Sequence, residues 1–146
     1  MAELVYLFRI VLALVLGGIL GWQRENWGKS AGPRTYALVA GGSALFTILS
    51  VVAFGADTAR VASQIVVGIG FLGAGTILHK ENRVEGLTTA AGLWMVAAIG
   101  MAVGLKFYIL SSVVSLLVLL IFMINDKKLK SRKGFQPASA EDDAEM

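Results

Sequence analysis

Cysteine is missing from this sequence, and histidine occurs only once, at His79. Disulfides, thiolate metal sites and cysteine nucleophiles are therefore excluded, as are metal sites that need several histidines. A Ser-His-Asp triad would have to use His79 as its base, and a histidine next to a lysine is most simply an exposed loop residue. The sequence therefore predicts a protein that is not an enzyme and that has no cofactor.

Charge is also scarce, and long apolar runs replace it. Of the 146 residues, 56% are hydrophobic and 16% are charged, whereas soluble domains have about 45–50% and about 25%. The mean hydropathy is +0.72. This composition predicts that the chain lies in a lipid bilayer. Nucleic acid is not an expected partner.

Four apolar runs are candidates for membrane spans. Crossing ~30 Å of hydrocarbon takes about 20 helical residues. The runs are Leu4–Trp22, Thr35–Phe54, Ala62–Leu78 and Leu87–Ile124. The first has no basic segment before it and no small-residue cleavage site after it, so we interpret it as a retained anchor and not a signal peptide.

The last run is too long for one crossing. As one helix it would be nearly twice as long as the hydrocarbon layer is thick, so we expect the chain to fold back near residues 104–106. This predicts an all-α bundle of about five transmembrane helices in residues 1–125. The third run is short and glycine-rich, and a re-entrant or broken segment is an open alternative there.

Basic residues gather on one side of this five-span topology. Most Lys and Arg residues lie in the loops after the first and third spans and in the C-terminal tail, while the other side has Arg60 and Lys106. The positive-inside rule then predicts an N-terminus outside and a C-terminus in the cytoplasm. Residues 126–146 are basic and then acidic, which predicts a disordered tail. Its basic part either lies on anionic lipid or only stops transfer.

Glycines are spaced for helix packing. The stretch from Gly68 to Gly73 matches the dinucleotide pattern G-x-G-x-x-G, but it lies within an apolar run and does not follow a strand. Small residues let helices approach closely in lipid, so we interpret it as a packing surface, and 17 glycines in the chain also favour a homo-oligomer. The glycines predicted to pack helices are Gly17, Gly21, Gly68, Gly70, Gly73, Gly75, Gly100 and Gly104.

Polar residues at the helix ends are the functional candidates. Asp57, Arg60 and Gln64 share one helix face. They form either an interfacial helix start, with Asp57 as the N-cap, or a polar entrance to a cavity. On the predicted cytoplasmic side, Glu25 and Glu85 could bind a cation such as magnesium, but an ion-pair lock or simple flanking charge is favoured because cations lie close by. The complete set is Arg24, Glu25, Arg34, Thr35, Asp57, Arg60, Gln64, Glu85, Thr88 and Thr89.

One basic residue, Arg9, lies inside the first span. A charge at that depth is costly unless its side chain reaches the headgroups or finds a partner. We favour an Arg9 side chain that snorkels outward. The alternative is an ion pair with Glu3.

Several of these stretches together resemble the MgtC/SapB family of bacterial inner-membrane proteins. The most specific are residues 57–75, DTARVASQIVVGIGFLGAG, and residues 84–94, VEGLTTAAGLW. Gln23-Arg24-Glu25 and Gly32-Pro33-Arg34-Thr35 are similar to the first-loop signature of the family. The resemblance extends from about Gly17 to Tyr108.

The resemblance implies a multi-pass inner-membrane protein that takes part in adaptation to low magnesium or related stress and, in pathogens, in virulence. It also implies ATP synthase as a candidate membrane partner, because MgtC proteins are associated with its restraint. The chain departs from MgtC at Thr88, Gly92 and Met95, where MgtC has Asn, Thr and Cys. The cytoplasmic C-terminal domain of MgtC is not matched, which indicates the short SapB-like branch.

Two functions remain open at this point. The favoured one is a non-enzymatic protein that acts by binding a membrane partner or by self-association. The alternative is a small oligomeric channel or transporter for magnesium or another ion, with a path lined by Asp57, Arg60, Gln64 and the cytoplasmic carboxylates. A magnesium ion bound at the cytoplasmic carboxylates is the one exception left open to the absence of a cofactor.

Overall fold

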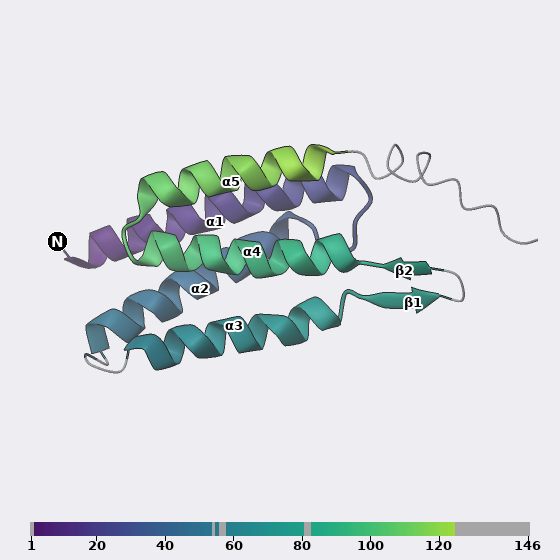
Figure 1. Ribbon diagram of the computed structural model, residues 1–146. Helices are drawn as coiled ribbons and strands as arrows, with labels where there is room; N and C mark the ends of the chain where they lie inside the picture. The colour runs from purple at the N-terminus through teal and green to yellow at the C-terminus, as the bar shows by residue number, and fades with distance from the viewer. Residues whose placement is uncertain (1, 54, 56–57, 81–82, 125–146) are drawn as a thin grey trace, which may run out of the picture.

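The computed structural model describes residues 2–53, 55, 58–80 and 83–124, and these residues form five helices and one short β-hairpin (Figure 1). The helices are α1 (Ala2–Asn26), α2 (Pro33–Ala53), α3 (Thr58–Ala74), α4 (Leu87–Gly104) and α5 (Tyr108–Met123). The hairpin pairs β1 (Leu78–Lys80) with β2 (Arg83–Glu85) in antiparallel fashion. The predicted all-α bundle is confirmed. The tail at residues 126–146 lies outside the described residues.

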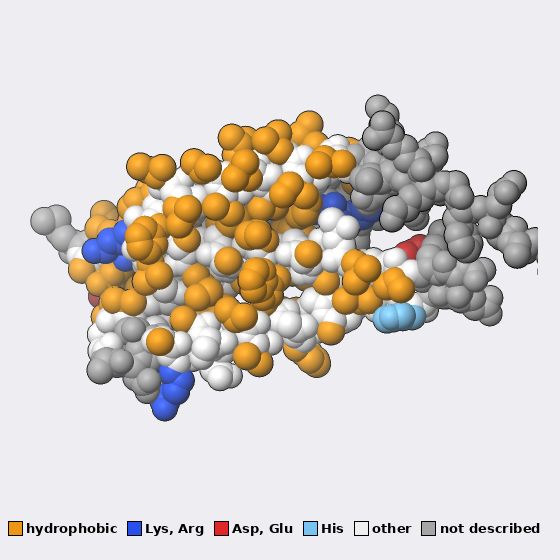
Figure 2. All heavy atoms as spheres, viewed as in Figure 1, with side chains coloured by type: hydrophobic (Ala, Val, Ile, Leu, Met, Phe, Trp, Pro, Cys, Tyr) orange, Lys and Arg blue, Asp and Glu red, His pale blue; other side chains and the backbone are white. Residues whose placement is uncertain are grey.

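The surface and the helix lengths are those of a membrane protein. Helices α1, α2 and α4 are long and apolar enough to cross a bilayer, while α3 and α5 are apolar but shorter, with 17 and 16 residues. Hydrophobic side chains cover most of the face seen in Figure 2. Phe71 and Ile109 are each 83% exposed, and water would penalise so extensive an apolar surface. Lipid therefore surrounds the bundle.

The helices lie side by side and alternate in direction (Figure 1). One end of the bundle, which we call the hairpin end, holds the α1–α2 loop, the hairpin and the last turn of α5. The other, the N-terminal end, holds the start of α1 and the α4–α5 turn. Helix α2 packs against α1 and α4, and α3 lies at the edge of the bundle against α2 and α4. The third predicted span is one unbroken helix from Thr58 to Ala74.

The chain reverses direction between α4 and α5, as the sequence predicts. Lys106 has φ +71°, and Phe107 N–H donates to Ala102 C=O across the turn. This pattern is the usual way to end a helix with a residue in the left-handed conformation. The reversal places α5 antiparallel to α4.

Glycine and alanine bring α1, α2 and α4 into close contact. A Cβ at Gly17 would lie 2.5 Å from the carbonyl oxygen of Tyr36, and a Cβ at Gly100 would overlap the carbonyl oxygen of Ala40. A Cβ at Gly21 or Gly104 would lie 2.6 Å or 2.9 Å from the nearest atom of α2. These four glycines are among the described positions where an added Cβ would come closest to a neighbouring segment.

The glycines of the third predicted span are placed differently. A Cβ at Gly68 or Gly70 would have no atom of another element within 4 Å. Gly73 is at ordinary contact distance from Ala90, and Gly75 meets only carbonyl oxygens of the preceding turn. Among the described residues, the expected packing of Gly68 and Gly70 on a neighbouring helix is therefore not found. Their small size instead leaves space on the surface of α3.

Candidate functional site

Arg24, Tyr36, Thr89 and Phe122 meet inside the hairpin end, and we call them the hairpin-end cluster. Arg24 lies in the last turn of α1 and is only 2% exposed. Its Nη2 donates to Thr89 Oγ1 at 3.4 Å, and its guanidinium carbon lies 4.4 Å from the centre of the Phe122 ring. The cluster therefore joins α1 to α4 and α5 through one buried cation.

Tyr36 completes the cluster from α2. Its hydroxyl donates to the carbonyl oxygen of Thr89 at 3.4 Å, and its ring meets the Phe122 ring edge to face at 6.2 Å between centroids. A Cβ at Gly92 would overlap the Tyr36 hydroxyl and lie 2.7 Å from Phe122 Cζ. Glycine at this position is what lets the two rings approach α4.

The polar groups of the hairpin-end cluster are incompletely paired. Gln23 Nε2 donates to the carbonyl oxygen of Phe122 at 3.0 Å. Among the described residues, buried Gln23 Oε1 and Arg24 Nε have no hydrogen-bond partner. A buried cation with an unpaired donor is a common mark of a functional position.

The other predicted polar residues do not join this cluster. Glu25, Arg34, Thr35 and Thr88 are exposed at the hairpin end, and Glu85 is partly buried at the end of β2. In the described ranges, no group of three or more His, Asp or Glu side chains lies where it could hold a metal ion.

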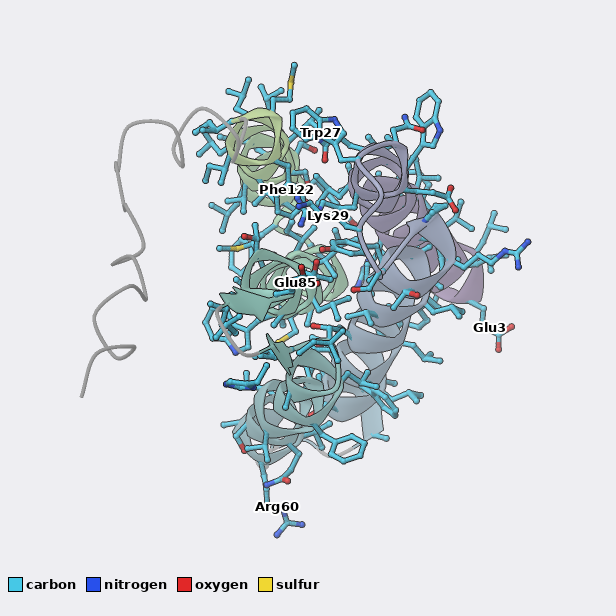
Figure 3. All side chains as sticks on the ribbon, turned by 90° about the vertical axis from the view of Figure 1, so that its right-hand side faces the viewer. Glu3, Trp27, Lys29, Arg60, Glu85 and Phe122 are labelled. Atoms are coloured by element: carbon cyan, nitrogen blue, oxygen red, sulfur yellow. The ribbon has the colours of Figure 1, made fainter. Side chains whose placement is uncertain are left out.

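The α3 residues lie elsewhere. Arg60 is exposed near the start of α3, at the N-terminal end of the bundle. Figure 3 looks along the bundle from the hairpin end, and in it Arg60 points away from the helices. Gln64 lies one turn deeper. Asp57 falls outside the described residues, so its position beside Arg60 and Gln64 stays a prediction.

A groove of about 500 Å³ runs between α2 and α3. We call it the α2–α3 groove, and apart from Ser43 and Gln64 its lining is apolar or glycine. Gly42 and Gly68 line it where no side chain fills the space. Gln64 therefore borders a groove, but the groove is not a polar path. Its lining residues are Leu38, Val39, Gly42, Ser43, Phe46, Val61, Gln64, Ile65, Gly68, Ile69 and Leu72.

Arg9 is buried, and the interpretation that it snorkels outward was wrong. It is 6% exposed, and its Nε donates to the Tyr108 hydroxyl at 3.2 Å. Its Nη1 donates to the carbonyl oxygen of Gly104 at 3.3 Å, and its guanidinium lies over the ring of Tyr6 at 5.3 Å. These contacts hold the Arg9 side chain against the α4–α5 turn.

Sequence reasoning identified Arg24 and Thr89 but missed the aromatic members of the cluster. Tyr36 and Phe122 lie in apolar runs, where an aromatic ring is usually a core or lipid-facing residue. The hydroxyl of Tyr36, one turn from Gly32-Pro33, was the only available signal for it. No signal in the sequence distinguishes Phe122 from its apolar neighbours.

Comparison with known proteins places the chain in a family. The model of the MgtC family matches residues 10–131. The chain is 44% identical over 129 residues to the Escherichia coli K12 protein named "Putative magnesium transporter YhiD", covering 80% of this chain and 60% of that protein. It is 38% identical over 136 residues to Protein MgtC of Salmonella typhi, covering 93% of this chain and 58% of that protein.

A Haemophilus influenzae protein without an assigned function is 39% identical over 128 residues, covering 80% of this chain and 54% of that protein. The chain thus spans less than two thirds of the length of these relatives. No solved structure matches it.

Proposed function

This chain is a member of the MgtC family of membrane proteins, and from that premise we propose that it acts in magnesium-related physiology without catalysing a reaction. It does so by binding a membrane protein, or a second copy of itself, within the bilayer. The names of the relatives MgtC and YhiD support the link to magnesium. The family resemblance supports the bacterial inner membrane as its location and adaptation to low magnesium or related stress, including virulence in pathogens, as its setting.

The α2–α3 groove is the observation that carries this proposal. It opens toward the lipid, and Gly42 and Gly68 leave space where a neighbouring transmembrane helix could approach closely. Gln64 places an amide at membrane depth, where a polar group facing lipid is costly. A partner helix that filled the groove and bonded Gln64 would remove that cost. ATP synthase, suggested by the resemblance, is one such membrane protein.

The topology is part of the proposal. The five helices cross the bilayer in turn, with the N-terminal end outside and the hairpin end in the cytoplasm, as the distribution of basic residues favours. Because the chain has no cysteine, a single cysteine placed at Ser30 can be labelled selectively. A membrane-impermeant maleimide should modify it in inverted vesicles and not in intact cells. Labelling in intact cells would show that the hairpin end lies outside and would contradict the proposed orientation.

Filling the groove tests the proposed function. Gly68→Leu should block the groove, and Gly70→Leu is the matched control, because Gly70 lies on the same helix, has equal space around it and does not line the groove. Gly68→Leu should abolish the ability of the protein to support growth in low magnesium. It should also abolish cross-linking of a photoreactive residue placed at Leu38 to the partner. Gly70→Leu should keep both activities. Equal behaviour of the two variants would contradict the proposal.

Ion transport is the second candidate, favoured by the transporter named among the relatives. Purified protein in liposomes should then carry magnesium down a gradient, and a dye sensitive to magnesium inside the vesicles would detect it. If the unaltered protein gives no flux under any magnesium gradient, transport by this chain alone is refuted. Partner binding would be unaffected by that result.

A further inference from the structure

A second pocket lies at the N-terminal end and shares no lining residue with the α2–α3 groove. Its volume is about 160 Å³, and residues of α1, α2 and the α4–α5 turn line it. Two of them, Arg9 and Lys106, are basic, and none of the described residues lining the pocket is acidic. The lining consists of Tyr6, Arg9, Ile48, Val51, Val52, Gly104, Leu105 and Lys106. We call it the N-terminal-end pocket.

The hydrogen bonds of Arg9 fix the depth of this pocket. Because Arg9 bonds the carbonyl oxygen of Gly104, it lies level with the turn where the chain reverses. A reversal exposes backbone groups that hydrocarbon cannot satisfy, so the turn belongs at the level of the lipid headgroups. The apolar residues Ile48, Val51 and Val52 border the pocket on α2. The pocket therefore has a charged part at headgroup depth and an apolar wall.

The basic groups keep capacity for an anion. A guanidinium has five N–H donors, and the two bonds to Tyr108 and Gly104 use two of them. Lys106 contributes a second cation from the turn itself. Glu3, the acidic residue nearest to Arg9 in the sequence, is exposed and points away from the bundle in Figure 3. Two cations that face one small pocket repel each other unless an anion lies between them.

We infer that the N-terminal-end pocket binds a phosphate group, supplied by the headgroup of an anionic phospholipid. Arginine and lysine are the side chains that bind phosphate best, the first through paired N–H donors and the second as a point charge. The wall formed by Val51 and Val52 contacts the glycerol and the first part of an acyl chain. The site is independent of the partner-binding groove between α2 and α3.

Native mass spectrometry of the detergent-purified protein tests this inference with three probes. They are phosphatidylglycerol, diacylglycerol with the same acyl chains, and inorganic phosphate. The unaltered protein should retain phosphatidylglycerol in clear preference to diacylglycerol. If inorganic phosphate at millimolar concentration displaces the lipid, the site keeps its chemistry but free phosphate is its occupant. If it does not, the lipid is the occupant.

Three variants locate the site. Lys106→Asn removes the charge, and Asn tolerates the left-handed conformation of this turn. It should lower phosphatidylglycerol retention about fivefold, which corresponds to the ~1 kcal/mol that one basic residue contributes at a lipid surface. Val51→Trp fills the pocket without changing charge and should lower retention similarly. Arg60→Gln is the control, because Arg60 is a cation outside the pocket lining, and it should stay within about twofold of the unaltered protein.

Two results would overturn the inference. One is equal retention of phosphatidylglycerol and diacylglycerol by the unaltered protein. The other is a loss in Arg60→Gln as large as that in Lys106→Asn, because lipid would then respond to overall charge and not to this pocket. Neither Lys106 nor Val51 is buried, so both variants are expected to fold. An unchanged elution profile in size-exclusion chromatography would verify that.

Discussion

Replacing Gly100 by alanine should destabilise the bundle, although alanine is the better helix former. Gly100 lies in α4, where it faces Ala40 of α2. An added Cβ would overlap the carbonyl oxygen of Ala40 and come within 2.9 Å of its carbonyl carbon and 3.0 Å of its Cα. All three are backbone atoms, so no side-chain rotation can relieve the overlap. The helices must move apart.

The magnitude follows from two opposing terms. Overpacking a well-packed contact costs about 1–3 kcal/mol, and a clash with backbone belongs at the upper end of that range. Replacing a helical glycine by alanine gains about 0.5–1 kcal/mol. The net loss for Gly100→Ala is therefore about 1–2 kcal/mol. For a chain of this length each kcal/mol shifts Tm by roughly 3 °C.

Gly42→Ala is the matched control because Gly42 lies in α2 with no atom within 4 Å of an added Cβ. Only the propensity gain of about 0.5–1 kcal/mol acts there, so Tm should rise slightly. Thermal unfolding in detergent, followed by fluorescence-detected size exclusion, measures both variants. Opposite signs support close packing of α2 on α4. A Gly100→Ala protein as stable as Gly42→Ala would refute it.

Further predictions concern the buried cations. A double-mutant cycle of Arg24→Met and Phe122→Leu, read by thermal unfolding, should give a coupling of about 1–2 kcal/mol, because their contact is desolvated; additive effects would show that the stacking contributes nothing. Tyr36→Phe should lose about 1 kcal/mol in the same assay, since the carbonyl oxygen of Thr89 loses a donor, and an unchanged Tm would contradict that bond. Arg9→Met should speed hydrogen exchange at residues 104–108 by tenfold or more, because the α4–α5 turn loses a bond worth about 1.5–3 kcal/mol; unchanged exchange measured by mass spectrometry would show that the turn is held by other contacts.

Hydropathy located the spans, but it could not locate the helix ends. The predicted first span stops at Trp22, whereas α1 continues to Asn26, because a helix can extend past the hydrocarbon through polar residues. The predicted second span begins at Thr35, but α2 begins at Pro33, since proline fits the first turn of a helix. In both cases the sequence pattern reports depth in the membrane and not backbone hydrogen bonding.

The hairpin was not predicted. Residues 79–86 look like a polar loop because their strands are short and carry charge. Gly86 explains how the hairpin meets α4, since it has φ +90° and a Cβ there would overlap the carbonyl oxygen of Thr76. Only glycine tolerates both conditions. Such a close approach between residues ten positions apart leaves no periodic pattern to detect.

The sequence predicted some residues of the site, but it did not predict which of them contact one another. Arg24 and Thr89 were both named from the sequence, yet their contact spans 65 positions and depends on how α1 and α4 cross. Phe122 enters the cluster only because α5 packs back along α1. Gly68 was expected to pack against a helix, and it lines an open groove instead. The chemistry of a side chain follows from the residue itself, whereas the distance between two side chains depends on how all the helices pack.

The tie between Arg9 and the α4–α5 turn has a consequence for how the protein is made. The partners of Arg9 lie 95 and 99 positions later in the chain. At a synthesis rate of about 5–20 residues per second, the first helix waits on the order of 5–20 s in the insertion machinery before Gly104 and Tyr108 emerge. Through that interval its guanidinium has neither partner, so at the headgroup level water and lipid phosphates must accept its hydrogen bonds until the α4–α5 turn is made.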